Sequence, residues 1–340
     1  MTARNIPPKR AVEEYLRSRN DVQTSTRQNH RYRLSIFVQW ADKEDVESMA
    51  TLDGFDLQRY KNWRTNGDDA PENVLLTIEQ HLHTLRVFLR WCEDADLVVE
   101  DLADKVVLPD VATSDRSRDV AVAHERAQAI IDYYCKYEWA TREHLIIHTL
   151  YHTGLRRSGL HALDIDDWHP EDRYLAVRSR PDTGTRLKLG DNGERNVTVH
   201  DERLVDAIND WIADLRPETV DEHGREPLVS SGAGRMYPQS ITGVCYRVTR
   251  PCVIGTECPH DRDPDDCKAT KYSHASKCPS SVSSHPLRRS AITHHLSEDV
   301  PKDVCSDRMS VSPEVLDKHY DARDVEQKRQ NREQYLDRLD

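Results

Sequence analysis

The sequence predicts a mainly α-helical protein with a small antiparallel β-sheet, organised as two domains. Apolar residues recur at helical spacing through residues 10–105, two short segments alternate as strands do, and 340 residues exceed what one hydrophobic core usually holds. We therefore expect a helical domain at 1–110, a linker at 111–120, a second domain at 121–330 and a helical tail at 331–340.

The N-terminal domain is predicted to be a small helical bundle. One apolar stripe consists of Leu82, Leu85, Leu89 and Cys92, and a second apolar stripe ends at Trp40. The polar faces of these helices carry five arginines: Arg27, Arg31, Arg33, Arg86 and Arg90. Such guanidinium groups can contact phosphates, and they can equally be solvated surface residues.

The second domain combines helices with the predicted sheet. An apolar run that includes Leu145 and Leu150 ends at Gly154, where a new helical pattern begins. Residues 174–178 and 195–199 alternate as two strands, and the apolar positions of 204–215 are spaced as in a core-facing helix. This order of elements is typical of an α+β domain.

The charge balance is acidic, which is unusual for a protein that binds nucleic acid. Acids outnumber bases by 60 to 48, and the bases are 12 Lys and 36 Arg. An acidic, lysine-poor surface is expected of a protein that stays soluble in concentrated salt, where charges are screened within a few ångströms. We expect a halophilic source, such as a halophilic archaeon; unfolding on dilution of KCl would test this expectation.

No apolar stretch reaches 18 residues, and the N-terminus lacks the apolar core of a signal peptide. We expect a cytoplasmic protein with no membrane contact. The eight cysteines should therefore be reduced or bound to metal.

A cysteine-rich insert at about residues 252–278 of the second domain predicts a metal-binding site. Four cysteines lie within 27 residues: Cys252, Cys258, Cys267 and Cys278. The stretch is rich in Asp and Pro and poor in apolar residues, so it needs a cross-link to fold, and four thiolates can supply one around zinc. We expect a structural zinc ion, in which His260 or His274 could replace one sulfur.

Four further residues form a set suited to phosphodiester chemistry. Arg156 follows the break at Gly154, His285 and Arg288 stand three residues apart, and Tyr320 lies 32 residues after Arg288. The three-residue step places His285 and Arg288 on one face of a helix. Two arginines that hold a phosphate, an imidazole and a tyrosine can break and rejoin a phosphodiester without a metal.

At these positions the sequence resembles the tyrosine recombinase (phage integrase) family. The family signature is a T-G-L-R box, an H-x-L-R box and a later nucleophilic tyrosine, and the resemblance covers about residues 115–330. It implies a SAM-like core-binding domain that closes over DNA, followed by a tyrosine recombinase catalytic domain. It also implies a site-specific recombinase or integrase that needs neither ATP nor a catalytic cofactor.

The resemblance assigns a role to each residue of the set. Arg156 and Arg288 would hold the non-bridging oxygens of the phosphate, and the Tyr320 hydroxyl would attack the phosphorus to give a 3′-phosphotyrosine. His285 would accept the tyrosine proton.

A lysine completes the set in the family, where it reaches the leaving 5′ oxygen from the hairpin between the two strands. Lys188 is the only lysine between Lys136 and Lys268, so it is the candidate by elimination. The alternative is that Lys188 is an ordinary exposed lysine in a turn.

The sequence departs from the family pattern at several positions. The second histidine or tryptophan falls on Val311, the neighbouring glycine falls on Ser310, and the usual acid falls on Gly159. Arg289 stands where histidine is common. Because valine cannot donate a hydrogen bond, activity would be lowered unless a neighbour such as His319 or Arg289 substitutes.

The expected partner is double-stranded DNA. The resemblance implies a homotetramer on DNA, with a monomer or dimer when the protein is free. Two alternatives remain open: a type IB topoisomerase, which uses the same residue set, and a zinc-bearing DNA-binding protein whose active site has weakened.

Overall fold

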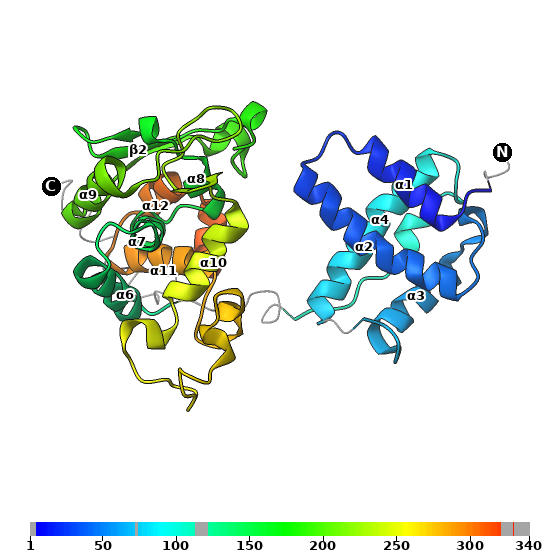
Figure 1. The fold of residues 1–340 in the computed structure, drawn as a ribbon. Coiled ribbons are helices and arrows are strands. Elements are labelled where there is room, and N and C mark those ends of the chain that lie inside the picture. Colours follow the sequence, from blue (N-terminus) through cyan, green and yellow to red (C-terminus); the bar gives the residue numbers. More distant parts are fainter. Residues whose placement is uncertain (1–4, 72–73, 113–121, 321–328, 330–340) are drawn as a thin grey trace. The chain divides into compact units, whose positions relative to one another are not determined.

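The computed structural model describes residues 5–71, 74–112, 122–320 and 329. The chain divides into two compact units, Met1–Asp119 and Val120–Asp340 (Figure 1). The linker predicted at 111–120 lies outside the described residues from 113 onward, and the tail predicted at 331–340 lies wholly outside them.

Four α-helices build the first unit: α1 (Pro8–Ser18), α2 (Thr24–Lys43), α3 (Gly54–Asn66) and α4 (Leu75–Asp94). The start of α3 is fixed by a capping box, in which the Asp53 side chain accepts hydrogen bonds from the Phe55 and Asp56 backbone. Phe37, Trp40 and Phe88 are buried at the centre of the bundle. The predicted helical bundle is confirmed.

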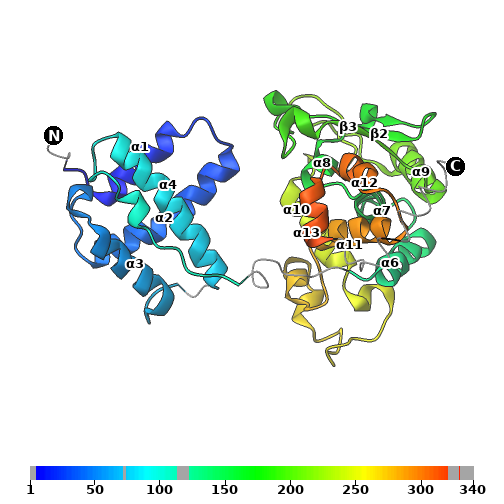
Figure 2. The ribbon, with the colours of Figure 1, turned by 180° about the vertical axis from the view of Figure 1, so that it is seen from behind.

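The second unit is also mainly helical. Its helices are α6 (His124–Tyr137), α7 (Arg142–Thr153), α8 (Arg157–Ala162), α9 (Glu202–Asp210), α10 (Pro238–Val248), α11 (Ser284–Ser297), α12 (Lys302–Met309) and α13 (Pro313–His319). α7 contacts α6, α8, α9, α10 and α11, and every residue from His144 to Tyr151 is buried. A helix enclosed on all sides needs no polar face, which explains the apolar run in the sequence. Figure 2 shows α11, α12 and α13 from behind.

The sheet of this unit has the order β1 (Trp168–His169), β2 (Tyr174–Val177) and β3 (Arg195–Thr198). The strands are antiparallel, and Leu175 of β2 faces Val197 of β3. β4 (Ser230–Ser231) and β5 (Gly234–Arg235) form a separate ribbon. The predicted hairpin is confirmed, whereas the two-residue β1 was too short to be predicted.

The helix predicted at 204–215 differs from expectation at its end. Leu204, Val205, Ile208 and Trp211 are buried, but Leu215 is 50% exposed. The α-helix widens into a π-helical turn at Trp211–Leu215, which rotates the last residue away from the core.

An ionic network holds the long connection between β2 and β3 against the rest of the unit. Arg225 pairs with Asp164 at 2.7 Å, and Arg180 pairs with Asp167 at 2.6 Å. Arg225 also donates to the Thr185 hydroxyl at 2.9 Å. Because the network fixes residues 180–185, it fixes the base of the loop that carries Lys188.

None of the helices in the described part of the chain has the length and apolarity that a bilayer crossing requires.

Candidate active site

Arg156 is positioned by a sharp corner between α7 and α8. Gly154 ends α7 in the left-handed conformation, with φ of 61°, and a Cβ there would lie 2.8 Å from the Met309 sulfur. Arg156 is the N-cap residue of α8, as the break in the sequence predicts, and its side chain is half-buried.

His285 and Arg288 lie in the first two turns of α11. Arg288 is only 3% exposed, and its Nη1 donates to the carbonyl of Gly154. This bond joins α11 to the corner that presents Arg156. The residues of the two arginine boxes, distant in sequence, therefore meet as predicted.

The predicted residues lie near enough to influence one another's ionisation. Burial lowers the pKa of Arg288 to about 9, with a further contribution from the positive charge of Arg156, and the Tyr320 phenol opposes this shift. Burial likewise lowers the pKa of Arg156, and Tyr320 again opposes the shift. The pKa of His285 is lowered by burial and then by the charges of Arg288, Lys188 and Arg156, among others. His285 is therefore neutral at pH 7 and able to accept a proton.

Lys188 reaches the same site from the connection between β2 and β3. Its side chain is exposed, while the neighbouring Leu187 is buried and anchors the loop. A pocket at this place is lined by nine described residues: Arg156, Ser158, Gly159, Leu187, Lys188, Leu189, Gly193, Arg195 and Ser310. The lining contains three cations and no acid, so it suits an anion.

Tyr320 follows α13 directly and is 9% exposed. The Arg289 guanidinium carbon lies 5.6 Å from the centre of its ring, a cation–π contact that orients the phenol. Arg156 and Lys188 thus line one pocket, and Arg288 is bonded to the corner that presents Arg156. The charges of these residues influence or are influenced by His285 and Tyr320, although the five residues come from four separate segments of the chain.

The departures from the family pattern have structural explanations. Val311 is 7% exposed and packs in the core. Ser310 adopts the left-handed conformation with φ of 51°, which suits the glycine of the family pattern. A Cβ on Gly159 would lie 3.3 Å from Leu155, so the site is tight for an acidic side chain. The side chain of His319 lies outside the described part.

Arg195, on β3, was missed by the sequence analysis although it lines the pocket. Its Nε donates to the Arg308 carbonyl and its Nη1 to the Gly193 carbonyl, both at 2.7 Å. A signal was present, because Arg195 shares a strand face with Val197, which is fully buried. An arginine on the inner face of a strand is unusual, so Arg195 could have been named as a candidate site residue.

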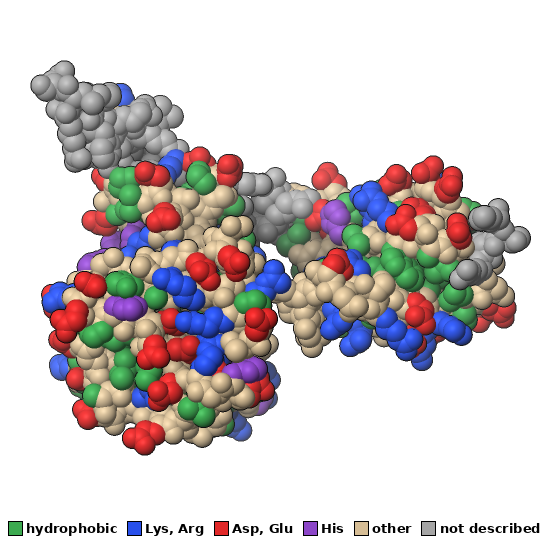
Figure 3. Space-filling model, turned by 90° about the horizontal axis from the view of Figure 1, so that it is seen from above, with side chains coloured by type: hydrophobic (Ala, Val, Ile, Leu, Met, Phe, Trp, Pro, Cys, Tyr) green, Lys and Arg blue, Asp and Glu red, His purple; other side chains and the backbone are tan. Residues whose placement is uncertain are grey.

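The five arginines predicted on the polar faces of the first unit divide into two groups. Arg33 donates to Thr84 and Gln80, Arg86 donates to the Val106 carbonyl, and Arg90 pairs with Asp104. Arg27 and Arg31 have no partner among the described residues. On the face in Figure 3, basic side chains gather along one edge of the first unit, and acidic and basic side chains are interspersed on the second.

The four cysteines of the predicted metal site line one cavity, together with His260. All four are half-buried and reduced. His260 Nε2 lies 2.7 Å from the Ser280 hydroxyl, and His274, which contacts Ser273, is not part of the lining.

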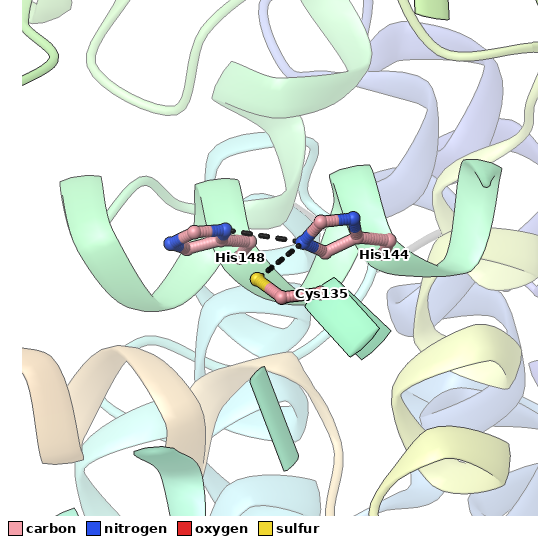
Figure 4. Close-up of side chains that lie close together, drawn as sticks. All are labelled: Cys135, His144 and His148. Carbon is pink, nitrogen blue, oxygen red and sulfur yellow. Dashed lines mark hydrogen bonds between the residues drawn. The ribbon is translucent and has the colours of Figure 1, made fainter. Parts of the chain in front are cut away.

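Another group of potential metal ligands, Cys135, His144 and His148, lies in the interior of the second unit (Figure 4). The backbone N–H of Ala140 donates to His144 Nδ1 at 3.1 Å, so the proton of neutral His144 sits on Nε2. His144 Nε2 lies 3.3 Å from His148 Nδ1, and His148 Nε2 lies 3.1 Å from Asp201. Because Nε2 of His144 has no lone pair to offer, we interpret this group as a hydrogen-bonded chain.

Comparison with known proteins gives a consistent result. No family model matches the chain. Tyrosine recombinase XerC of Mycobacterium sp. (strain KMS) is 26% identical over 255 residues, which cover 73% of this chain and 71% of that protein. XerC of Mycobacterium tuberculosis (strain ATCC 25177 / H37Ra) is 26% identical over 273 residues, covering 77% and 75%.

Two solved structures share the fold. The Tn1549 transposon integrase in complex with transposon right end DNA has a TM-score of 0.67 at 14% identity, covering 97% of this chain and 99% of that chain. The lambda integrase bound to DNA has a TM-score of 0.60 at 10% identity, covering 94% and 100%. The predicted fold class, mainly α with a small antiparallel sheet, is confirmed.

Proposed function

We propose that this chain, a member of the tyrosine recombinase family, is a site-specific DNA recombinase that cuts and rejoins DNA through a 3′-phosphotyrosine intermediate. The observation that carries the proposal is the proximity of the five predicted residues: Arg156 and Lys188 line one cation-rich pocket. Arg288 donates to the Gly154 carbonyl beside Arg156, and the ionisation of these groups is coupled to His285 and Tyr320. The similarity to XerC recombinases supports it.

The reaction assigns one task to each side chain. Arg156 and Arg288 hold the non-bridging oxygens by charge-assisted hydrogen bonds, which strengthen as negative charge grows during in-line attack. The Tyr320 oxygen bonds to phosphorus, its proton passes to neutral His285, and the bond to the 5′ oxygen breaks. Lys188 donates a proton to that oxygen.

The intermediate explains why no ATP is required. The phosphotyrosine ester keeps the energy of the broken phosphodiester. A 5′ hydroxyl from another strand can therefore attack the ester, release Tyr320 and complete strand exchange.

DNA is the partner in this proposal. The compared integrase structures contain DNA. Arg27 and Arg31 of the first unit are candidate phosphate contacts because no described residue engages them. We propose a homotetramer on DNA and a monomer or dimer in its absence; the halophilic archaeal source likewise stays a prediction.

The test is to trap the covalent intermediate. Duplexes that the protein retains are selected from a random-sequence pool and then nicked at successive positions, so that a cleaved end diffuses away and religation fails. We expect an adduct that survives denaturing electrophoresis. If no retained duplex gives an adduct, the protein binds DNA but does not cleave it. If the protein relaxes plasmid DNA without forming junctions, it is a topoisomerase.

We also propose that Cys252, Cys258, Cys267 and Cys278 hold a structural zinc ion. Their placement around one cavity and the small core of the insert support this. Four thiolates fit zinc, which would tie the end of α10 to the segment before α11 without taking part in catalysis.

The zinc proposal predicts about one zinc per chain by elemental analysis, a stoichiometry expected for one four-thiolate site. Cys267→Ser should lose the metal and lower the melting temperature. Cys135→Ser is the matched control, because Cys135 lies outside the insert, and it should retain zinc. Zinc that is lost from Cys135→Ser and kept by Cys267→Ser would contradict the assignment.

A further inference from the structure

Arg195 occupies the same pocket as Arg156 and Lys188 without being part of the predicted catalytic set. It is the first residue of β3, paired with Val177 of β2, so its main chain is fixed by the sheet. Two of its three guanidinium nitrogens donate to the carbonyls of Arg308 and Gly193. No described residue accepts a hydrogen bond from the third nitrogen, Nη2.

The positive charges around Arg195 favour the binding of an anion at this place. Burial lowers the pKa of Arg195 to about 10, with the positive charge of Arg156 as the next cause. Arg195 in turn helps to lower the pKa of Arg288. Three half-buried or buried guanidinium groups repel one another, and no acid is among the described residues that line the pocket. A bound phosphate would relieve this repulsion.

We propose that Arg195 is a third phosphate-binding arginine of the active site, whose Nη2 contacts the DNA phosphate held by Arg156. The inference rests on the proposed function and adds a binding residue to it. The two carbonyl bonds orient the guanidinium in advance, so little side-chain freedom is lost when the phosphate arrives.

The arrangement also distinguishes Arg195 from its neighbour Arg308. Arg308 donates to the carbonyls of Thr198 and His152, and it does not line the pocket. Both arginines tie β3 to nearby segments, but only Arg195 faces the cation-lined space. Arg308 is therefore the matched control for a purely structural arginine.

The experiment measures cleavage of the nicked duplex by the wild type, Arg195→Gln and Arg308→Gln. Each protein is tested with a native phosphate and with an uncharged methylphosphonate at the cleavage position. If Arg195 binds the phosphate, Arg195→Gln should lose on the order of 100-fold with phosphate but less than about 5-fold with methylphosphonate. Arg308→Gln should lower the cleavage rate by the same factor with the phosphate and the methylphosphonate substrate.

Equal losses of Arg195→Gln on the two substrates would overturn the inference and leave Arg195 as a positioning residue. If Arg195→Gln does not fold, Arg195→Lys keeps the charge and serves in the same comparison. Wild-type protein that cleaves neither substrate would overturn the proposed function itself, and with it this inference. These outcomes are distinguishable because the wild type is measured first.

Discussion

Tyr320→Phe is expected to abolish the covalent DNA adduct and strand exchange while leaving DNA binding unchanged. The substitution removes only the hydroxyl oxygen that we propose attacks phosphorus. The phenyl ring keeps the packing of Tyr320 in the core and the contact with Arg289. Denaturing electrophoresis measures the adduct, and a gel-shift titration measures binding.

Tyr237→Phe is the matched control for this prediction. Tyr237 is 76% exposed, and no hydrogen bond of its hydroxyl is found among the described residues. This variant should form the adduct at the wild-type rate. An adduct formed by Tyr320→Phe would show that another residue is the nucleophile and would end the assignment.

Arg288→Lys is expected to slow cleavage by about 10²–10³-fold, the range found when one oxyanion donor is removed. Lysine keeps the positive charge but cannot make forked hydrogen bonds to two oxygens. It also cannot contact the phosphate and the Gly154 carbonyl in the same geometry, so the corner that presents Arg156 loses a support. Single-turnover cleavage, with thermal unfolding measured alongside, separates the chemical loss from the structural one.

Arg216→Lys provides the comparison for Arg288→Lys. The Arg216 side chain is only 5% exposed and donates to the carbonyls of Pro227 and Thr219, away from the pocket. The Arg216→Lys substitution should lower the melting temperature and leave the cleavage rate of the folded protein nearly unchanged. Similar cleavage losses in both variants would mean that Arg288 acts through stability alone.

Much of the fold could be predicted from the sequence, because it depends on patterns among neighbouring residues. The enclosed helix α7, the β2–β3 hairpin and the helical first unit follow from the spacing of apolar residues. The sequence also predicted Arg156, His285 and Arg288, because each lies in a short motif beside the start of a helix.

The rest depends on contacts between distant segments. Arg195 belongs to the pocket only because β3 packs near the end of α12, which no local pattern reports. The contact of His148 Nε2 with Asp201 joins residues that are 53 positions apart, so the sequence around His148 does not report it. Leu215 was assigned to the core because a uniform helix was assumed, and the wider last turn made that prediction wrong.

Dissolved ions weaken an attraction between charges only where they can come between them. The carboxylate of Asp164 and the guanidinium groups of Arg225 and Arg235 are at most 15% exposed, whereas Lys43 and Asp69 of the first unit are 46% and 57% exposed. Raising the ionic strength should therefore loosen the outer pair and leave the inner network close to full strength. The base of the loop that carries Lys188 is thus held by buried ion pairs, which concentrated salt screens only weakly.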